Sequence, residues 1–275
     1  MQDTLSKIVY NEHLKGNYFR IGFETRWNDF TPGQFVMVEV KGGGAFLRRP
    51  FGIARLREGV LEVCYKVVGK GTDALSKMPV GSKTYVLGPL GNGFTLPLLC
   101  KEGRGEVEDL PHPNPPLTKG RELLVAGGYG IAPLLGLAEK LKGKDIHLFY
   151  GARNSDHLLY IDEFKELGVT LHLSTEDGST GEKGPVTGIL KKFLQVTSYR
   201  SQVTIYACGP HAMLTAIKSS VISDRSSVID CQLSLESYMA CGIGACIGCV
   251  VKDAKGNYVK VCKEGPVFSA KDVSF

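Results

Sequence analysis

Short runs rich in β-branched and aromatic residues, separated by turn residues, occupy the first hundred positions of the chain. The clearest runs lie at residues 18–23, 34–40, 60–68 and 83–87. Strands of this length and spacing predict an antiparallel barrel or sandwich. Glycine, proline and asparagine dominate residues 88–93 and end this module. We therefore expect a β-barrel domain over residues 1–99.

From residue 121 onward the hydrophobic pattern changes to strands that alternate with helical segments. A hydrophobic strand, a glycine-rich turn and an amphipathic helix follow one another over residues 121–141, and further strand-like runs lie at 145–153, 169–174 and 202–208. Such alternation predicts a doubly wound parallel sheet. We place this α/β domain at residues 121–234 and a small cysteine-rich subdomain at 235–275.

The stretch between these two domains, residues 100–120, is polar and rich in glycine and proline. Four prolines fall within residues 111–116 and are incompatible with a helix or a central strand. We interpret the stretch as a flexible or polyproline-like insert that serves as a linker. A proline-rich docking motif is the alternative interpretation, and a tolerated surface insertion is favoured over it.

Composition places the chain among soluble globular proteins. It has 275 residues, of which 43% are hydrophobic and 22% charged, and a net charge of +5 without a long basic run, which argues against nucleic-acid binding. We find neither a signal-peptide pattern nor 18 continuous apolar residues, so we expect a cytoplasmic protein without a membrane span. Four scattered cysteines are then expected to be reduced packing residues: Cys64, Cys100, Cys208 and Cys231.

The strongest motif is a set of four cysteines near the C-terminus, spaced C-x4-C-x2-C-x12-C: Cys241, Cys246, Cys249 and Cys262. The first two gaps are those of plant-type [2Fe–2S] proteins. Nearby glycines allow the loop to bring its N–H groups close to the sulfurs. A four-cysteine zinc site, disulfides and ordinary buried thiols are the alternatives. Zinc sites favour two CxxC-like knuckles, whereas one arm carries three ligands here, so the cluster is favoured.

Two patterns in the predicted barrel indicate phosphate binding. Arg48 and Arg49 stand beside Pro50 and could clamp a pyrophosphate. Residues 69–72 read Gly-Lys-Gly-Thr, a loop after a strand that offers amide and hydroxyl donors. Each pattern alone is more typical of a surface turn, but their order on a predicted barrel favours a cofactor site.

The α/β domain carries a dinucleotide-binding pattern of the form G-x-G-x-x-P. Its glycines let the backbone approach a diphosphate at the start of a helix, and a proline is well placed in the first helical turn. A second strand ends in Cys-Gly-Pro, where such sheets have their ligand crevice, although Cys208 could equally be a buried core thiol. The residues expected to contact the dinucleotide are Gly127, Gly128, Gly130, Ile131, Ala132, Pro133, Cys208, Gly209 and Pro210.

Three charged residues of this domain have two interpretations each. Arg153 either binds ribose or phosphate or is an exposed loop residue. Glu176 and Asp177 either form a turn or face the adenosine, where their charge would disfavour a 2′-phosphate and favour NAD over NADP.

Taken in order, these motifs resemble those of the ferredoxin–NADP reductase superfamily. The C-terminal sequence Leu-Glu-Ser-Tyr-Met-Ala-Cys-Gly-Ile-Gly-Ala-Cys-Ile-Gly-Cys resembles one branch in particular, the electron-transfer subunits of type B dihydroorotate dehydrogenases. The resemblance covers nearly the whole chain except residues 101–120.

This resemblance implies an FAD site and a set of iron ligands. The ligands would be the four motif cysteines, and FAD would be held by Arg49, Pro50, Phe51, Gly52, Cys64, Tyr65, Lys66, Gly71 and Thr72. Two positions depart from the family pattern. Gly52 stands where serine or threonine is usual, which removes a side-chain hydrogen bond to the flavin. Lys66 stands where arginine is common, which replaces a planar guanidinium group with forked donors by an ammonium group that acts as a point charge.

The resemblance also implies a function in pyrimidine biosynthesis. NAD(H) would exchange a hydride with FAD, and the [2Fe–2S] cluster would pass single electrons to or from a separate catalytic subunit. That partner would contain FMN, oxidise dihydroorotate and form an assembly of two plus two chains. We expect no acid–base catalytic residue in this chain. The alternatives are a reductase of the same fold that feeds another acceptor, and a zinc-stabilised nucleotide-binding module without redox turnover.

Overall fold

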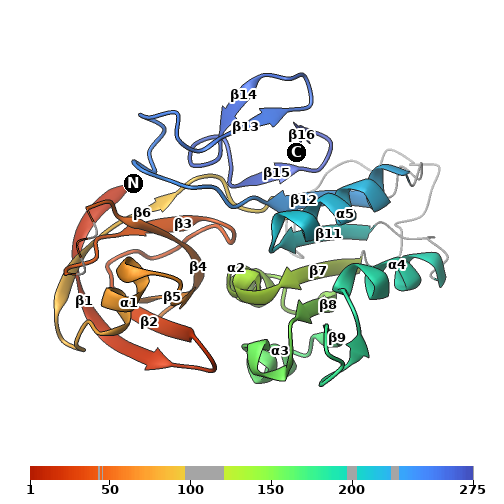
Figure 1. Ribbon diagram of the computed structural model, residues 1–275, viewed down its shortest axis with the longest axis horizontal. Coiled ribbons are helices and arrows are strands. Elements are labelled where there is room, and N and C mark those ends of the chain that lie inside the picture. The colour runs from red at the N-terminus through yellow and green to blue at the C-terminus, as the bar shows by residue number, and fades with distance from the viewer. Residues whose placement is uncertain (43, 45, 97–120, 197–202, 224–228, 275) are drawn as a thin grey trace, which may run out of the picture.

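Three units follow one another along the chain: a barrel, a mainly parallel sheet with helices, and a small C-terminal module (Figure 1). The computed structural model describes residues 1–42, 44, 46–96, 121–196, 203–223 and 229–274. The predicted insert at 100–120 and the thiol of Cys100 lie outside the described residues.

The first unit is a closed barrel of six antiparallel strands in the order β1-β2-β5-β4-β3-β6, which confirms the predicted barrel. Buried and more exposed positions alternate along strands such as β6, so one face fills the barrel interior. The elements of this unit are β1 (Gln2–His13), β2 (Tyr18–Glu24), β3 (Phe35–Val38), β4 (Arg49–Arg57), β5 (Val60–Lys66), α1 (Lys70–Ser76) and β6 (Lys83–Leu90).

One local expectation in the barrel is wrong. Residues 69–72 do not form an extended loop, because α1 begins at Lys70 with Gly69 as its N-cap. The Thr72 hydroxyl accepts hydrogen bonds from the backbone N–H groups of Val68 and Gly69, at 2.9 and 3.3 Å. The hydroxyl therefore stabilises the start of the helix.

The second unit is built on a sheet with the strand order β10-β9-β8-β7-β11-β12-β15, in which only β15 is antiparallel to its neighbour. Its elements, up to the last parallel strand, are β7 (Arg121–Gly127), η1 (Gly128–Gly130), α2 (Ile131–Lys140), β8 (Asp145–Ala152), η2 (Ser155–His157), α3 (Ile161–Glu166), β9 (Thr170–Thr175), β10 (Glu182–Lys183), α4 (Val186–Val196), β11 (Val203–Cys208), α5 (His211–Ser223) and β12 (Ile229–Ser234).

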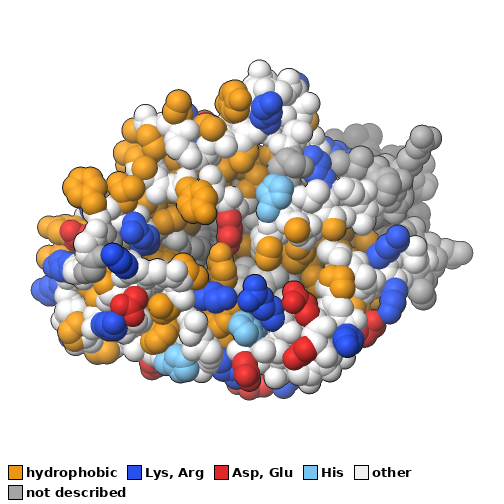
Figure 2. Space-filling model, viewed as in Figure 1, with side chains coloured by type: hydrophobic (Ala, Val, Ile, Leu, Met, Phe, Trp, Pro, Cys, Tyr) orange, Lys and Arg blue, Asp and Glu red, His pale blue; other side chains and the backbone are white. Residues whose placement is uncertain are grey.

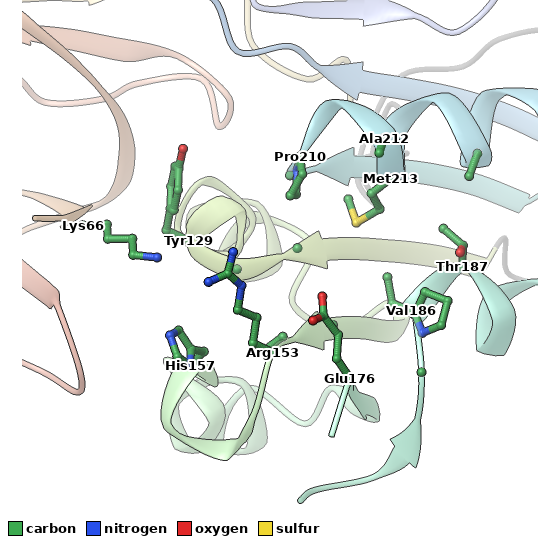
Figure 3. Close-up of a pocket in the computed structure, with 18 of the residues that line it drawn as sticks. Lys66, Tyr129, Arg153, His157, Glu176, Val186, Thr187, Pro210, Ala212 and Met213 are labelled. Atoms are coloured by element: carbon green, nitrogen blue, oxygen red, sulfur yellow. The ribbon is translucent and has the colours of Figure 1, made fainter. Parts of the chain in front are cut away.

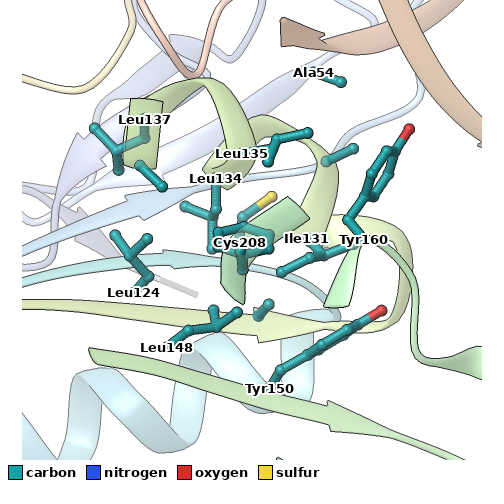
Figure 4. Packing of buried hydrophobic residues seen from close by; sticks show 14 of the residues in the cluster. Ala54, Leu124, Ile131, Leu134, Leu135, Leu137, Leu148, Tyr150, Tyr160 and Cys208 are labelled. Atoms are coloured by element: carbon teal, nitrogen blue, oxygen red, sulfur yellow. The ribbon is translucent and has the colours of Figure 1, made fainter. Parts of the chain in front are cut away.

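Both faces of this sheet are covered, as predicted for a doubly wound fold. Along β7, Leu124 and Ala126 join the core under α2 and α3, whereas Leu123 and Val125 join the core under α4 and α5. Strands buried on both faces have nearly continuous apolar sequences, which explains the hydrophobic runs in β7, β8 and β11. Figure 4 shows the α2 side of this packing around Ile131 and Leu134.

The third unit carries the cysteine motif and a small antiparallel sheet in the order β14-β13-β16: β13 (Val250–Asp253), β14 (Tyr258–Lys260) and β16 (Val273–Ser274). Its remaining strand, β15 (Val267–Ser269), instead pairs with β12 at the edge of the large sheet. The amide of Gln232 also exchanges two hydrogen bonds of 2.8 and 2.9 Å with the backbone of Thr95. Because of β15, the segment after the predicted boundary at residue 234 contributes a strand to the sheet of the preceding domain.

The barrel and the large sheet meet along α2. A Cβ added at Gly136 would lie 2.7 Å from the Ala54 carbonyl oxygen of β4, so the helix and the strand approach to backbone distance. Lys140, at the end of α2, pairs with Asp29 of the barrel at 2.6 Å. One hydrophobic cluster contains residues of both units, so they share a core.

Among the helices in the described ranges, none has the length and apolar content needed to cross a membrane.

Candidate functional site

Two glycine-rich turns lie side by side at the carboxyl ends of β7 and β11, which are neighbours in the sheet. The strand order reverses direction at this pair, and such a switch point is where open α/β sheets bind ligands. A Cβ on Gly130 would overlap the Cys208 carbonyl, and one on Gly127 would lie 2.6 Å from Pro210. These glycines are required for the contact between the turns themselves.

A cavity of about 520 Å³ opens beside these turns (Figure 3). The turns and the start of α5 form one wall, and the loops after β8 and β9 form another. The barrel contributes Tyr18 and Lys66. Of the nine residues expected to contact the dinucleotide, four line this cavity: Gly127, Gly128, Gly209 and Pro210.

Charged side chains are distributed unevenly around this cavity. Lys66, Arg153 and His157 stand near one another, and Glu176, after β9, lies on the other side of Arg153 toward Val186 (Figure 3). The ring of His157 makes an edge contact with that of Tyr18, with centroids 5.5 Å apart. Asp177 does not line the cavity and instead accepts hydrogen bonds from Ser179, so it forms the turn.

A second cavity, of about 350 Å³, lies between the barrel and the sheet. Eight of the nine residues implied by the resemblance for FAD line it: Arg49, Pro50, Phe51, Gly52, Cys64, Tyr65, Lys66 and Thr72. Gly130, Ala132, Pro133 and Cys208, expected at the dinucleotide, line this cavity instead. Ile131 lines neither cavity, and its fully buried side chain packs in the core.

Only one of the two neighbouring arginines reaches the second cavity. Arg49 lines it, and the ninth residue, Gly71, lies directly beneath, where an added Cβ would be 2.8 Å from Arg49 Nε. The expectation that Arg48 shares the clamp is wrong, because its guanidinium makes two 2.8 Å hydrogen bonds with Asp3.

Two thiols border the second cavity from opposite domains. Burial raises the pKa of Cys64 and of Cys208 to about 12 in each case. Both are therefore protonated at neutral pH, and neither is a nucleophile. They add small, polarisable and uncharged walls to the site.

Three residues line both cavities: Lys66, Tyr129 and Glu236. The Tyr129 hydroxyl donates a 2.9 Å hydrogen bond to Glu236. Glu236 is open to the cavities, yet the concave wall removes much of its water and this desolvation raises the pKa of its carboxyl. The two cavities thus meet at a hydrogen-bonded acid and phenol.

One wall of the second cavity, which includes Glu236, is formed by the segment that leads to the cysteine motif. Residues 234–239 line it, and Cys241 follows two residues after Met239. The backbone of the cavity wall is therefore continuous with the first thiol of the motif.

The four motif cysteines fit a two-iron cluster in their donor set and their environment. Backbone N–H groups point at the sulfurs, from Gly244 to Cys262 at 3.2 Å and from Cys246 to Cys241 at 3.4 Å. Gly242 and Gly244 have φ values of 71° and 80°, which only glycine adopts cheaply. Hydrogen-bond donors and glycine turns around thiolates are what an iron–sulfur loop requires.

The motif thiols neighbour one another. The Cys241 thiol lies beside Cys246, and the Cys262 thiol lies beside Cys249 and is also influenced by Cys241. Within the described part of the chain, no group of three or more His, Cys, Asp or Glu side chains is placed to hold a single metal ion.

The thiols also differ in acidity. Desolvation opposes ionisation of Cys241, but N–H groups of Cys246, Ile243 and Ala245 outweigh it and lower its pKa to about 6. Burial and the neighbouring Cys249 raise the pKa of Cys262 to about 12.

Sequence reasoning missed several residues of the site, notably Tyr18, Tyr129, His157 and the stretch 234–239. Glu236, Tyr238 and Met239 directly precede the first cysteine, so their position next to the motif was the available signal. Neither Tyr18 nor His157 lies next to a motif in the sequence, so no comparable signal indicated them.

Comparisons with known proteins agree with this geometry. Residues 236–274 match the iron–sulfur cluster binding domain of dihydroorotate dehydrogenase B, and residues 124–219 match the oxidoreductase NAD-binding domain. The chain is 37% identical over 273 residues to the electron transfer subunit of dihydroorotate dehydrogenase B (NAD(+)) from Caldanaerobacter subterraneus, with 98% of each chain covered. The subunit of the same name from Fusobacterium nucleatum is also 37% identical, with 98% of this chain and 94% of that protein covered.

Solved structures show the same fold. The NADH-dependent reduced ferredoxin-NADP oxidoreductase, studied for flavin-based electron bifurcation, superposes with a TM-score of 0.78 at 30% identity and covers 98% of this chain and 90% of its own. A ferredoxin NADP+ reductase from Neisseria gonorrhoeae, with bound FAD and NADP, gives a TM-score of 0.63 at 17% identity over 86% of this chain and all of its own. With its iron–sulfur domain matched and its whole length covered by such relatives, the chain belongs to the family of electron transfer subunits of dihydroorotate dehydrogenase B.

Proposed function

We propose that this chain is the electron transfer subunit of an NAD-dependent dihydroorotate dehydrogenase that acts in pyrimidine biosynthesis. The observation that carries the proposal is that two cavities and the cysteine motif adjoin one another. The larger cavity meets the second cavity at Tyr129 and Glu236, and the wall of the second cavity that contains Glu236, residues 234–239, continues into the cysteine motif. This adjacency suits a relay among NAD(H), FAD and a [2Fe–2S] cluster.

The residues of the chain bind and position the cofactors. Arg49 provides positive charge in the flavin cavity, whereas Lys66 and Arg153 do so for the dinucleotide phosphates. The four motif cysteines hold the cluster, and N–H groups of the loop bond to its thiolates. When bound, FAD would exchange a hydride with NAD(H) and single electrons with the cluster, which would join two-electron to one-electron chemistry.

A separate catalytic subunit completes the proposed reaction. In our proposal this partner contains FMN and oxidises dihydroorotate, the assembly has two copies of each chain, and it works in the cytoplasm. The surface around the cysteine motif supports docking there, because Ile247 is 77% exposed and Tyr238 96% exposed. Figure 2 shows hydrophobic side chains gathered over this upper left part of the molecule.

Anaerobic spectroscopy tests the relay itself. The purified chain is expected to contain iron, acid-labile sulfide and FAD, and NADH should bleach both the flavin and the cluster absorption. A colourless protein that contains zinc would refute the relay. Bleaching without electron exchange with the dihydroorotate-oxidising subunit would instead indicate a reductase for another acceptor.

A surface variant tests the partner. Ile247→Asp should keep NADH-driven bleaching but lose most dihydroorotate-dependent reduction of NAD+ in the mixed subunits, because the charge opposes docking. Val80→Asp is the matched control, since Val80 is also exposed but lies in the barrel just before β6. Equal coupling in both variants would contradict docking at the cysteine motif.

A further inference from the structure

A buried hydrogen-bond network joins the barrel to the α/β domain outside both cavities. At its centre is Glu62 of β5, which is 1% exposed. Its carboxylate accepts hydrogen bonds from the hydroxyls of Tyr10 at 2.6 Å and Tyr160 at 3.0 Å, and it pairs with Arg55 at 3.1 Å. Tyr10 and Arg55 belong to the barrel, so Tyr160 is the one member of this network from the α/β domain.

Tyr160 is fixed in its backbone as well as in its side chain. It immediately precedes α3, with a φ of 57° and a ψ of 20° in the left-handed region. A bulky residue remains in this conformation only where its surroundings determine it. Its carbonyl accepts the first helical hydrogen bond, from Phe164 N–H at 3.1 Å. The position of Tyr160 is therefore fixed at the interface between the barrel and the α/β domain.

The segment that leads into Tyr160 forms one wall of the dinucleotide cavity. Arg153 and His157 project into that cavity from it (Figure 3). Within the domain, the hydroxyl of Tyr150 lies 3.0 Å from the His157 carbonyl oxygen and accepts a 3.2 Å hydrogen bond from Leu159 N–H. The segment is thus held by Tyr150 on one side and ends at Tyr160 on the other.

The facing wall of the dinucleotide cavity is formed by β5, the barrel strand that carries Glu62, and by β2, which pairs with β5. Lys66 lies four residues after Glu62 at the end of β5, and Tyr18 pairs with Lys66 in the barrel. The Tyr160 hydroxyl also lies beside the thiol of Cys64, which borders the flavin cavity. The Tyr160–Glu62 hydrogen bond therefore links the segment that carries Arg153 and His157 to the strand that carries Lys66.

We propose that Tyr160 is a positioning residue for NAD(H): its hydroxyl, held by Glu62, sets the wall with Arg153 and His157 against the wall with Tyr18 and Lys66. Tyr160 lines neither cavity. Walls fixed in advance reduce the ordering cost of binding. This inference rests on the proposed function, in which the dinucleotide occupies the larger cavity.

Tyr160→Phe is the direct test, because it removes one hydroxyl and leaves Glu62 with Arg55 and Tyr10. In the full chain with FAD and cluster bound, the Kd for NAD+ should rise about tenfold, the factor that corresponds to about 1.4 kcal/mol. The KM for NADH should rise in parallel, while kcat with an artificial acceptor changes less than about twofold. Amide hydrogen exchange over residues 155–160 should accelerate.

Lys140→Met is the matched control. It removes two other hydrogen bonds between the domains, to Asp29 and to the Phe30 carbonyl oxygen, and Lys140 lines neither cavity. Its Kd for NAD+ should stay within about twofold of the unchanged chain, since loss of a partly exposed ion pair has a small effect.

Each other result has a defined meaning. An unchanged Kd in Tyr160→Phe, an equal rise in Lys140→Met, or a Tyr160→Phe protein that no longer retains flavin would overturn the positioning role. If the unchanged chain itself does not bind NAD+, the proposed function fails instead.

Discussion

At the scale of single residues, the close approach of Gly52 and Pro133 accounts for the absence of a side chain at position 52. A Cβ at position 52 would lie 2.7 Å from Cγ of Pro133. The barrel and the glycine-rich turn therefore approach more closely here than a side chain allows. The missing hydroxyl at position 52 is linked to the fit of the two domains around the flavin cavity.

Gly52→Ser is accordingly expected to weaken FAD retention, although a serine could supply a hydrogen bond. Overpacking of this kind costs about 1–3 kcal/mol. Flavin content after gel filtration and the unfolding midpoint measure the effect. Pro133→Ala in the same chain should relieve the contact and restore part of the loss, and better FAD retention in Gly52→Ser alone would contradict this account.

Two stacked histidines confer a dependence on pH. Nδ1 of His147 lies 3.0 Å from Nε2 of His172, and the His172 ring stacks on Phe149 with centroids 4.4 Å apart. Burial lowers the pKa of both histidines, and Asp145 acts in the opposite direction on His147. The folded chain thus favours neutral rings, and the unfolded chain binds more protons at mildly acid pH.

Stability should therefore be complete above the ordinary histidine pKa of about 6.5 and be lost as the pH falls through the lower values of the folded state. We expect the thermal midpoint to fall by a few degrees between pH 7.5 and pH 5.5. His172→Phe keeps the stack and should reduce this fall, because one titrating ring is gone. An equal fall in both proteins would show that other groups are responsible.

At the scale of elements, the cysteine loop depends on backbone conformation. Gly244 has a φ of 80°, its N–H donates to the Cys262 sulfur, and an added Cβ would lie 2.9 Å from the side chain of Lys263. Gly248 has no positive φ, and its nearest neighbour, the Cys246 sulfur, would be at an ordinary 3.6 Å. The two glycines therefore differ in what a methyl group would disturb.

Gly244→Ala should lose most of the cluster, whereas Gly248→Ala should keep it. The left-handed backbone alone costs alanine about 1–2 kcal/mol, and the shifted N–H removes a donor to the sulfur. Iron and acid-labile sulfide per chain provide the measurement. Full cluster content in Gly244→Ala would show that the loop tolerates another conformation.

The types of element could be predicted from the sequence, but several contacts of the site could not. Strand periods and the glycine–proline turn identified β7, α2 and the barrel, because these patterns are local. Arg48 and Arg49 look alike in sequence, and only the fold assigns the first to Asp3 and the second to the cavity. Likewise, Gly130 matched a ligand-binding pattern, yet its closest constraint is the Cys208 carbonyl, 78 residues away in the chain.

At the scale of the whole molecule, the barrel and the sheet form one cooperative body, because α2 packs against both and the core crosses between them. Gly136→Ala should lower the stability of the entire chain by about 1–3 kcal/mol, since its Cβ would meet Ala54 and Phe30. Calorimetry should still show one transition for both domains.

Gly188→Ala in α4 is the matched helix substitution, because nothing lies within 4 Å of its added Cβ. It should be neutral or stabilising by up to about 1 kcal/mol, the difference in helix propensity. A loss of stability equal to that of Gly136→Ala would exclude a specific role for the α2 contact.

The path of the C-terminal segment restricts how such proteins can evolve. Residues 234–239 enclose the flavin cavity before the motif begins, and β15 afterwards returns to the edge of the large sheet. A gene truncated after residue 234 would encode a chain whose second cavity lacks this wall and whose large sheet ends at β12 (Figure 1). The cysteine-bearing part is therefore not an exchangeable cassette, because its removal would open both the cavity and the sheet edge.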